Sequence, residues 1–393
     1  MYFNTTALCG PTAFCAYMKE DSAYAEIHLP SMPPYLPRAS PYRRILTTIR
    51  LPWIWFPLLL GCSVVLHLQV VRLVHPPHHE ECRHEPIRST LDNYQHLHDF
   101  PVVNEEFFRS VPLVRSENAI VTSMYNDAFA APIATLGHSL NRVESNTRRI
   151  LFYIPGQVSE RALCIATVSG WEPHPVARVD PPADGGVHQH FIDQFTKLSI
   201  WKFDELGIKA VVYLDADTLV RRNFDELFAM PFNFAAVPDV YIDDPGFSIG
   251  FNAGVLFVRT STSAFHKLVS SINTARYAHW EAEQALLNVF YGADVVRLPY
   301  IYNGNMAIKR RNPEMWEGLQ SELRLIHYSL VKPFWREVYN ETGLEDMHRN
   351  VLMRAEEWDG TWRDEILEWG EAWKDTEDTH RYAITRCGWK HGH

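Results

Sequence analysis

Two aspartates one residue apart, Asp215 and Asp217, are the side chains of this sequence best suited to chemistry. They follow residues 211–214, an apolar and partly β-branched run that is typical of a buried parallel strand. In open α/β sheets, ligands bind at the carboxyl ends of the strands. Because alternate strand residues point in opposite directions, both acids can face one ion only if the strand ends at Asp215. The pair then favours a Mg²⁺ or Mn²⁺ ion that holds a diphosphate.

Two other interpretations of this pair are open. The pattern also resembles the nucleophile motif of haloacid-dehalogenase-type phosphatases, whose first aspartate is phosphorylated. Those enzymes usually begin their domain with this motif, whereas a long α/β pattern precedes it here, and the next acids, Asp243 and Asp244, follow too soon beside Pro245 and Gly246. The third interpretation is structural, with one acid capping a helix and the other lying in a solvated turn.

The acids need a sheet to hold them, and the surrounding sequence alternates between strand and helix patterns. This alternation predicts a largely parallel sheet that is covered by helices on both faces. Near the end of the chain, an aromatic stripe with helical spacing predicts a helix that packs one face onto the domain. The predicted strands are 119–123, 149–153, 211–214 and 251–258; the predicted helices are 132–140, 194–206 and 282–290; the stripe is Trp358, Trp362, Ile366, Trp369 and Trp373.

Composition limits the possible partners. The 393 residues are 46% hydrophobic and 21% charged, which is enough for a large core and argues against global disorder. A formal net charge of −10 argues against a nucleic-acid partner, although a bound metal ion can attract a nucleotide locally. The cysteines follow no zinc motif, and of those beyond the apolar segment below (Cys82, Cys164 and Cys387) at most one pair can form, with all three pairings open.

The N-terminal third predicts a membrane anchor. Residues 1–50 have the composition of a disordered cytosolic tail, and residues 51–73 contain an uncharged run long enough to span a bilayer as a signal-anchor. Arginines before this run favour a cytosolic N-terminus. Residues 74–115 then form a stem, and residues 116–393 the catalytic domain with a C-terminal helical extension. We therefore expect a single-pass type II protein of the Golgi membrane with a lumenal domain, or a cytosolic protein if residues 51–73 form only an apolar linker.

Six ordered motifs give the chain a resemblance to a known family. It resembles glycosyltransferase family 8, the glycogenin-like retaining transferases that use UDP-sugars, over roughly residues 118–336. The resemblance implies an α/β fold, namely a GT-A type Rossmann-like nucleotide-diphospho-sugar transferase domain with a mixed, mostly parallel sheet, here in a fungal-type membrane-anchored member. The motifs are residues 121–129, 196–198, 213–219, 251–255, 283–288 and 327–333.

The resemblance also implies roles for individual residues. Asp215, Asp217 and His327 match the metal ligands, and an imidazole in this set favours Mn²⁺ over Mg²⁺. Lys332 matches a diphosphate contact, and with the metal it would stabilise the departing UDP. Glu283 and Gln284 match an acid-amide pair that flanks the transferred sugar, and both are assigned with Lys332 to catalysis. The donor site would further include Thr122, Ser123 and Tyr125 at the base, Phe129 beside them, Lys197, Ala216, Asn252 and Ala253.

The function implied by this resemblance is metal-dependent transfer of a hexosyl unit from a UDP-sugar to a glycan or other hydroxyl acceptor. No double-displacement nucleophile is evident, so we expect retention by attack on the face that the UDP leaves. A homodimer is a further expectation. The alternative is a catalytically dead scaffold that binds sugar nucleotides, suggested by Glu283 where the family usually has aspartate and by Leu330 near a usual glycine. Lys309 stands near the position of the tyrosine that glycogenin glucosylates on itself, which argues against self-glucosylation.

Overall fold

The computed structural model describes residues 117–241, 249–335 and 344–388. The chain divides into two units, Met1–Ile87 and Arg88–His393, and all the described residues belong to the second. The predicted tail, anchor and stem therefore lie outside the described residues, and the proposed domain boundaries remain predictions. Among the described helices, none is both long enough and apolar enough to cross a bilayer.

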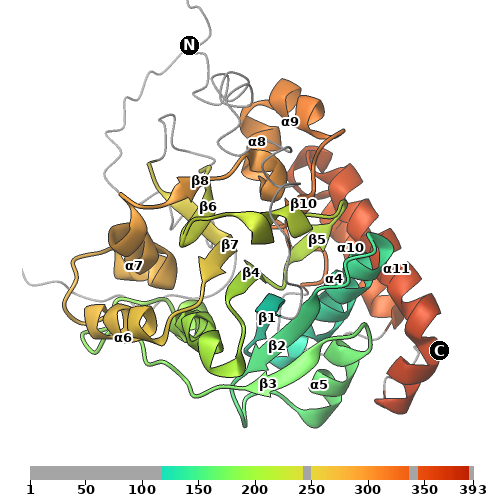
Figure 1. Ribbon diagram of the computed structural model, residues 1–393. Coiled ribbons are helices and arrows are strands. Elements are labelled where there is room, and N and C mark those ends of the chain that lie inside the picture. The colour runs from blue at the N-terminus through green and yellow to red at the C-terminus, as the bar shows by residue number, and fades with distance from the viewer. Residues whose placement is uncertain (1–116, 242–248, 336–343, 389–393) are drawn as a thin grey trace, which may run out of the picture. The chain divides into compact units, whose positions relative to one another are not determined.

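A mixed seven-stranded sheet lies at the centre of the second unit (Figure 1), in the order β3-β2-β1-β4-β7-β6-β8. The neighbours from β3 to β4 pair in parallel, whereas β7 runs antiparallel to both β4 and β6. The predicted mixed, mostly parallel sheet is thus confirmed. Its strands are β1 (Asn118–Met124), β2 (Arg148–Tyr153), β3 (Glu172–Pro175), β4 (Ala210–Leu214), β6 (Phe234–Pro238), β7 (Phe251–Arg259) and β8 (Val296–Arg297).

A second, three-stranded sheet has the order β5-β10-β9 and is built from distant parts of the chain. Strand β5 (Thr218–Val220) follows the aspartate pair directly, β9 is Gly304–Asn305 and β10 is Leu325–His327. Strand β10 pairs antiparallel with β5, and His327 is in register with Thr218. This pairing brings the predicted histidine ligand next to the predicted aspartate ligands.

Helices cover both faces of the central sheet, as the alternating pattern predicts. The predicted helices at 132–140 and 282–290 form, while the one at 194–206 forms as a 3₁₀ helix. The α-helices are α4 (Ala130–Arg142), α5 (Glu160–Thr167), α6 (Thr262–Ser271), α7 (Ala282–Tyr291), α8 (Ala307–Arg311), α9 (Pro313–Leu319), α10 (Leu344–Ala355) and α11 (Arg363–Arg386). The 3₁₀ helices are η4 (Asp127–Phe129), η5 (Gln189–Phe191), η6 (Gln194–Leu206), η7 (Asp225–Ala229), η8 (His279–Glu281), η9 (Tyr300–Tyr302) and η10 (Glu357–Gly360).

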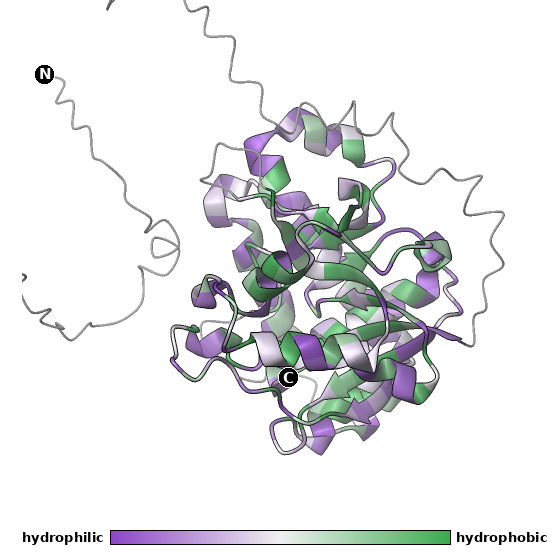
Figure 2. Cartoon of the chain, turned by 60° about the vertical axis from the view of Figure 1, so that its left-hand side comes forward, coloured by the Kyte–Doolittle hydropathy of each residue, from purple (hydrophilic) through white to green (hydrophobic). Residues whose placement is uncertain are grey.

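The two faces of the sheet form two hydrophobic cores. Alternate residues of β4 point to opposite faces, so Val212 joins one core and Val211 and Tyr213 join the other. The first core includes apolar residues of α4, α5 and α11, and the second includes those of η6, α6 and α7. Colouring by hydropathy shows the apolar strands inside and polar residues on the outer sides of the helices (Figure 2). Both cores hold β4 rigidly just before its carboxyl end.

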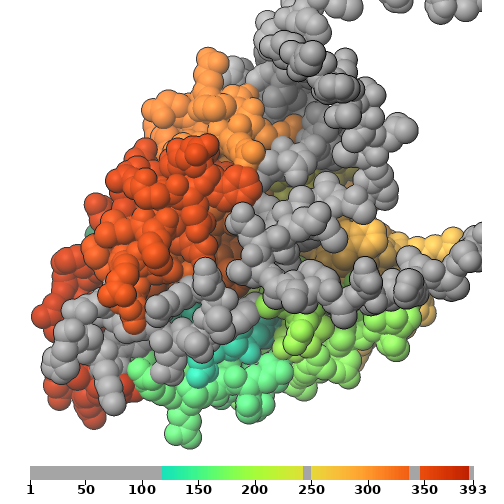
Figure 3. Space-filling view, turned by 180° about the vertical axis from the view of Figure 1, so that it is seen from behind, coloured from blue at the N-terminus to red at the C-terminus, as the bar shows by residue number. Residues whose placement is uncertain are grey.

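The C-terminal residues gather on one side of the second unit (Figure 3). Ile366, Trp369 and Trp373 are buried on one face of α11, so the packing role predicted for the aromatic stripe is confirmed for these residues. The prediction that Trp358 shares this helical face is wrong. Trp358 lies before α11 in η10 with a φ of 54°, a left-handed conformation that breaks the helical periodicity, and it is 41% exposed.

Candidate active site

The aspartate pair stands directly after β4, at the edge of the sheet where ligands of α/β proteins bind. The strand ends at Leu214, and the backbone then turns because Thr218 donates both its N–H (3.1 Å) and its hydroxyl (2.8 Å) to the carbonyl of Asp215. Asp215 is partly exposed and Asp217 is buried. The condition that the strand end at Asp215 is therefore met.

His327 completes a cluster with the two acids. Its Nε2 lies 3.3 Å from Oδ1 of Asp217 and 4.0 Å from Oδ2 of Asp215. One ligand atom from each of the three side chains lies within 4.8 Å of the others. Two carboxylates and an imidazole that converge in this way fit a divalent cation such as Mn²⁺. The structure thus brings together the three residues that the sequence assigned to one metal.

A chain of hydrogen bonds fixes which nitrogen of His327 faces the acids. The backbone N–H of Gly254 donates to Oδ1 of Asn252 at 3.0 Å, and Asn303 donates its amide to the same oxygen at 2.9 Å. The carbonyl oxygen of the Asn303 side chain then faces Nδ1 of His327 at 3.1 Å and must accept its proton. The remaining nitrogen, Nε2, keeps its lone pair toward the aspartates. A metal-binding histidine needs this tautomer.

Lys332 lies in the same cluster, with its ammonium donating to Oδ2 of Asp217 and, at 2.8 Å, to the carbonyl of Tyr328. Burial alone would raise the pKa of Asp217, but the charge of Lys332 holds this pKa well below its usual range. Asp217 is therefore a carboxylate throughout the physiological pH range. A cation bound at Asp217 would compete with Lys332 for this carboxylate.

Lys197 connects the metal cluster to the acid-amide pair. Its ammonium is buried, 2.6 Å from Oε1 of Glu283, 3.1 Å from Oδ1 of Asp215 and 3.2 Å from the carbonyl of Ala253. Burial opposes the charge of Lys197, yet Asp215 and Glu283 raise its pKa above the ordinary value. Burial likewise raises the pKa of Glu283, against the lowering effect of Lys197. Glu283 thus forms an ion pair with Lys197, at a position where the family usually has the shorter aspartate.

Gln284 is held beside an acid that the sequence analysis did not identify. Its Nε2 donates to Oδ2 of Asp239 at 2.9 Å, and its Oε1 accepts from the backbone N–H of Ala253 at 2.9 Å. Asn252 also lies within 3.4 Å of Oδ1 of Asp239. Burial raises the pKa of Asp239. Asp239 follows β6 as Asp215 follows β4, so the same strand-then-acid signal could have found it.

The backbone before the acid-amide pair has an unusual conformation. Ala282, which precedes Glu283, has φ 49° and ψ −134°, a region that residues with a side chain rarely occupy. Such strain persists only where the surrounding structure imposes it. Here it turns the chain from η8 into α7 so that Glu283 and Gln284 both point into the site.

The residues predicted at the nucleotide base lie at the end of β1. Thr122 donates its hydroxyl to the carbonyl of Leu214 at 2.8 Å, so this hydroxyl links β1 to β4. Ser123 lies 2.7 Å from the Tyr213 hydroxyl, which donates to Asp215 at 2.8 Å, and thereby supports a predicted metal ligand. Tyr125 and Phe129 are partly exposed just beyond.

Phe129 also contacts the segment that follows Lys332. Its ring lies 5.6 Å from the ring of Phe334 and 6.5 Å from that of Trp335, centroid to centroid. Thus Tyr125 and Phe129 remain the predicted base contacts with exposed surface. Ala216 lies between the two acids and is nearly buried, and its contact with a donor stays a prediction.

Comparison with known families agrees with this arrangement. Residues 188–338 match the profile of Glycosyl transferase family 8. This region contains five of the six motif segments, and residues 121–129 lie before it. With the mixed sheet described above, the match confirms the predicted GT-A type fold.

The chain is also similar to several curated proteins. The chain is 24% identical over 246 residues to "Glycogenin" of Neurospora crassa, covering 62% of this chain and 35% of that protein. It is 26% identical over 304 residues to "Galactinol synthase 1" of Ajuga reptans, covering 68% and 89%. It is 31% identical over 244 residues to "Glycogenin-2" of Homo sapiens, covering 59% and 46%. The chain thus spans less than half of the length of these two glycogenins.

Proposed function

We propose that this chain, a glycosyltransferase with a family 8 domain over residues 188–338, moves a hexosyl unit from a UDP-sugar to a hydroxyl acceptor with retention of configuration. The acceptor would be a glycan or another hydroxyl compound. We further propose that the reaction depends on a divalent cation, with Mn²⁺ preferred. The observation that carries this proposal is the convergence of Asp215, Asp217 and His327 within 4.8 Å at the end of β4.

The metal would be held by Asp215, Asp217 and Nε2 of His327. When bound, it supplies positive charge that stabilises the diphosphate as UDP departs. The choice of Mn²⁺ rests on the imidazole, which is a softer ligand than the oxygens that Mg²⁺ prefers.

The residues of the chain would act around the diphosphate and the sugar. Lys332, paired with Asp217 and the Tyr328 carbonyl, is placed to exchange this carboxylate for a diphosphate oxygen when a cation neutralises Asp217. Lys197 is too well paired to give up a proton, so it orients Glu283 and Asp215 by charge. Gln284, fixed by Asp239 and the Ala253 backbone, would contact the sugar ring.

These contacts argue against the catalytically dead scaffold. One of the two departures that suggested it, Glu283 where aspartate is usual, forms a 2.6 Å ion pair with Lys197. Self-glucosylation near residue 309 is not part of the proposal, because Lys309 is paired with the buried Glu365 at 2.8 Å.

We also propose that the domain works in an oxidising compartment, with residues 51–73 as its membrane anchor. The support is a disulfide between Cys164 and Cys387, one of the three pairings left open by the sequence. The acceptor sequence for N-glycosylation at Asn340 offers a test, although it lies outside the described residues. A glycosidase-sensitive mass shift that Asn340→Gln abolishes would support a lumenal domain; a cytosolic domain would carry no such glycan.

The activity can be tested on the full-length protein by UDP-sugar hydrolysis. UDP-glucose, UDP-galactose and UDP-N-acetylglucosamine would be assayed with Mn²⁺ and with EDTA. Loss of a metal ligand removes several kcal/mol of transition-state stabilisation, so Asp217→Ala should lower the rate by about 10²-fold or more. Asp378→Asn, at a partly exposed acid of α11, is the matched control.

Three outcomes are informative. Hydrolysis that EDTA and Asp217→Ala both abolish supports the proposal. Hydrolysis that neither affects would refute the metal role. Calorimetric binding of UDP and Mn²⁺ without turnover of any donor would favour the scaffold function instead.

A further inference from the structure

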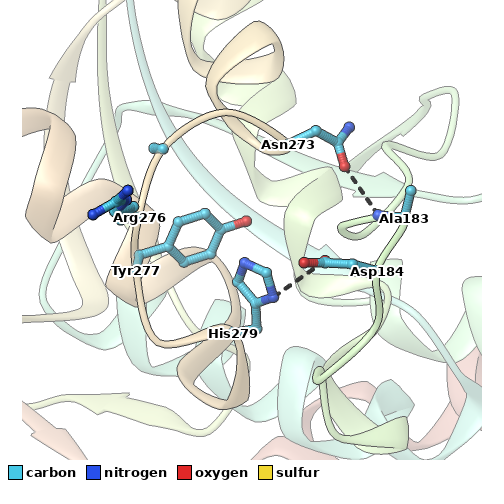
Figure 4. A pocket seen from close by; sticks show the side chains of 7 residues that line it. Ala183, Asp184, Asn273, Arg276, Tyr277 and His279 are labelled. Carbon is cyan, nitrogen blue, oxygen red and sulfur yellow. Dashed lines mark hydrogen bonds and ion pairs between the residues drawn. The ribbon is translucent and has the colours of Figure 1, made fainter.

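We propose that a cavity lined in part by His279, four residues before Glu283, binds a hexopyranose ring of the acceptor, an inference that rests on the proposed function. The cavity has a volume of about 520 Å³, which is within the range of small-molecule sites (Figure 4). It lies between a loop that follows β3 and the segment that connects α6 to η8. The lining residues used below are Ala183, Asp184, Asn273, Arg276, Tyr277 and His279.

Specific contacts hold the two walls of the cavity together. His279 Nδ1 lies 3.0 Å from the carbonyl of Gly185 and 3.4 Å from Oδ1 of Asp184. On the other side, Asn273 accepts the backbone N–H of Ala183 at 2.9 Å through Oδ1. Gly186, with a φ of +84°, passes so close that an added Cβ would stand 3.3 Å from Cβ of His279. The walls are therefore formed before any ligand binds.

The polar groups of the walls match a neutral polyol. Because a carbonyl can only accept, Nδ1 of His279 carries the proton toward Gly185, which leaves Nε2 as an acceptor in the neutral ring. Asn273 uses its oxygen for Ala183, which leaves its NH₂ as a donor. Asp184 adds an exposed carboxylate and Arg276 an exposed guanidinium. The hydroxyl groups of a polyol both donate and accept, so they can pair with all of these groups. An anionic ligand would be repelled by Asp184, and a cationic ligand would be repelled by Arg276.

One wall of the cavity is close along the chain to the acid-amide pair. His279 precedes Glu283 by four residues, so their Cα atoms are at most about 14 Å apart. Glu283 is ion-paired with Lys197 next to the metal cluster. The Tyr277 ring stands against His279 at 4.6 Å between centroids, and Trp280, next along the chain, is 56% exposed. The partly exposed Tyr277 ring among the lining residues suits an apolar face of a pyranose.

The test compares acceptor use with donor use in the full-length protein. The probes are methyl α- and β-hexopyranosides, maltose, lactose and cellobiose, with binding followed by saturation-transfer NMR and transfer followed with the active UDP-sugar. A lost hydrogen bond to a charged group weakens binding by about 10-fold or more. Asp184→Ala and Arg276→Ala should therefore raise the acceptor KM by about 10-fold, and this change should exceed any change in Mn²⁺-dependent hydrolysis. The matched controls are Asp294→Ala and Arg222→Ala, at exposed residues outside the cavity.

The outcomes separate this inference from the proposed function. If no probe binds the unmodified protein, or if both cavity variants bind and use the sugars normally, the acceptor site is not here. If sugar binding depends on Asp184 and Arg276 but no UDP-sugar is turned over, the cavity is a sugar site and the proposed function fails.

Discussion

Gly254 and His327 are packed so closely that residue 254 cannot carry a side chain without displacing the ring. A Cβ built on Gly254 would stand 2.7 Å from Nδ1 of His327 and 2.9 Å from Oδ1 of Asn252. Both atoms belong to the hydrogen-bond chain that directs Nε2 toward the aspartates. The small size of residue 254 is therefore required for His327 to keep its position beside the two aspartates.

Gly254→Ala should weaken Mn²⁺ binding because it moves a ligand. Shifts of ligand position and loss of supporting contacts typically cost about 10- to 100-fold in metal affinity. Mn²⁺ titration followed by electron paramagnetic resonance measures the change. Gly318→Ala is the control, because a Cβ there meets nothing within 4 Å. Equal Mn²⁺ affinity in the two variants would contradict the role of Gly254.

Asn303 is expected to act as a positioning residue for His327. Asn303→Leu removes the oxygen that accepts the Nδ1 proton, so the ring can adopt the wrong tautomer and Mn²⁺ affinity should fall by about 10- to 100-fold. Asn303→Asp keeps an acceptor at this position and should restore most of the affinity. A purely structural role for Asn303 would instead make both variants bind Mn²⁺ equally well or equally badly.

The aspartate pair of the proposed metal cluster was predictable because its signal is local, whereas His327 was assigned only through the family resemblance. An apolar run followed by two acids identifies β4 and its carboxyl end. The motif around His327, at the end of β10, points to a third ligand only when it is compared with the family. Asp239 was missed because no strand was predicted between residues 214 and 251, although β6 occupies Phe234–Pro238. Strands β4 and β6 both run antiparallel to β7, so their carboxyl ends lie at the same edge of the sheet.

Contacts between distant segments were not predictable. The pairing of Asn303 with His327 depends on β9 and β10 lying side by side, a register that no local pattern encodes. The aromatic stripe predicted α11 correctly from Ile366 onward but included Trp358, because spacing alone does not reveal the left-handed residues at Trp358 and Asp359.

Lys197→Met should destabilise the protein strongly. It would leave the carboxylates of Glu283 and Asp215 close together without the ammonium between them, and breaking a buried ion pair costs about 3 to 5 kcal/mol. Urea unfolding measures the loss. Adding Glu283→Gln should recover part of it by removing one of the charges. Lys202→Met, at a surface pair of the same helix, should cost less than about 1 kcal/mol. Equal losses at the two lysines would contradict the ion-pair assignment.

Glu377 on α11 should make the stability of the protein depend on pH. Its side chain is buried, and burial raises the pKa of Glu377 to about 7, against the lowering effect of Arg381. The folded state therefore holds this proton more tightly than the unfolded chain does. The resulting stabilisation is complete below the ordinary glutamate pKa of about 4.3 and is lost as the pH rises through 7.

Glu377→Gln mimics the protonated side chain at every pH. Its Tm should exceed that of the unmodified protein at about pH 8 and should match it at about pH 4. Glu371→Gln, at an exposed position of the same helix, is the control. A Tm difference that is the same at both pH values would show that burial of Glu377 does not set this dependence.

The disulfide between Cys164 and Cys387 joins α5 to the end of α11 across 223 residues, with Cα atoms 5.7 Å apart. Closing so long a loop lowers the conformational entropy of the unfolded chain. In the chain-entropy model this stabilises the folded protein by at most about 5 kcal/mol. Cys387→Ser should therefore lower the Tm, as should dithiothreitol added to the unmodified protein. Because either substitution removes the same bond, Cys164→Ser, Cys387→Ser and the double variant should have nearly equal Tm values, and dithiothreitol should not lower them further. Additive losses would show that the two cysteines contribute through packing and not through a shared bond.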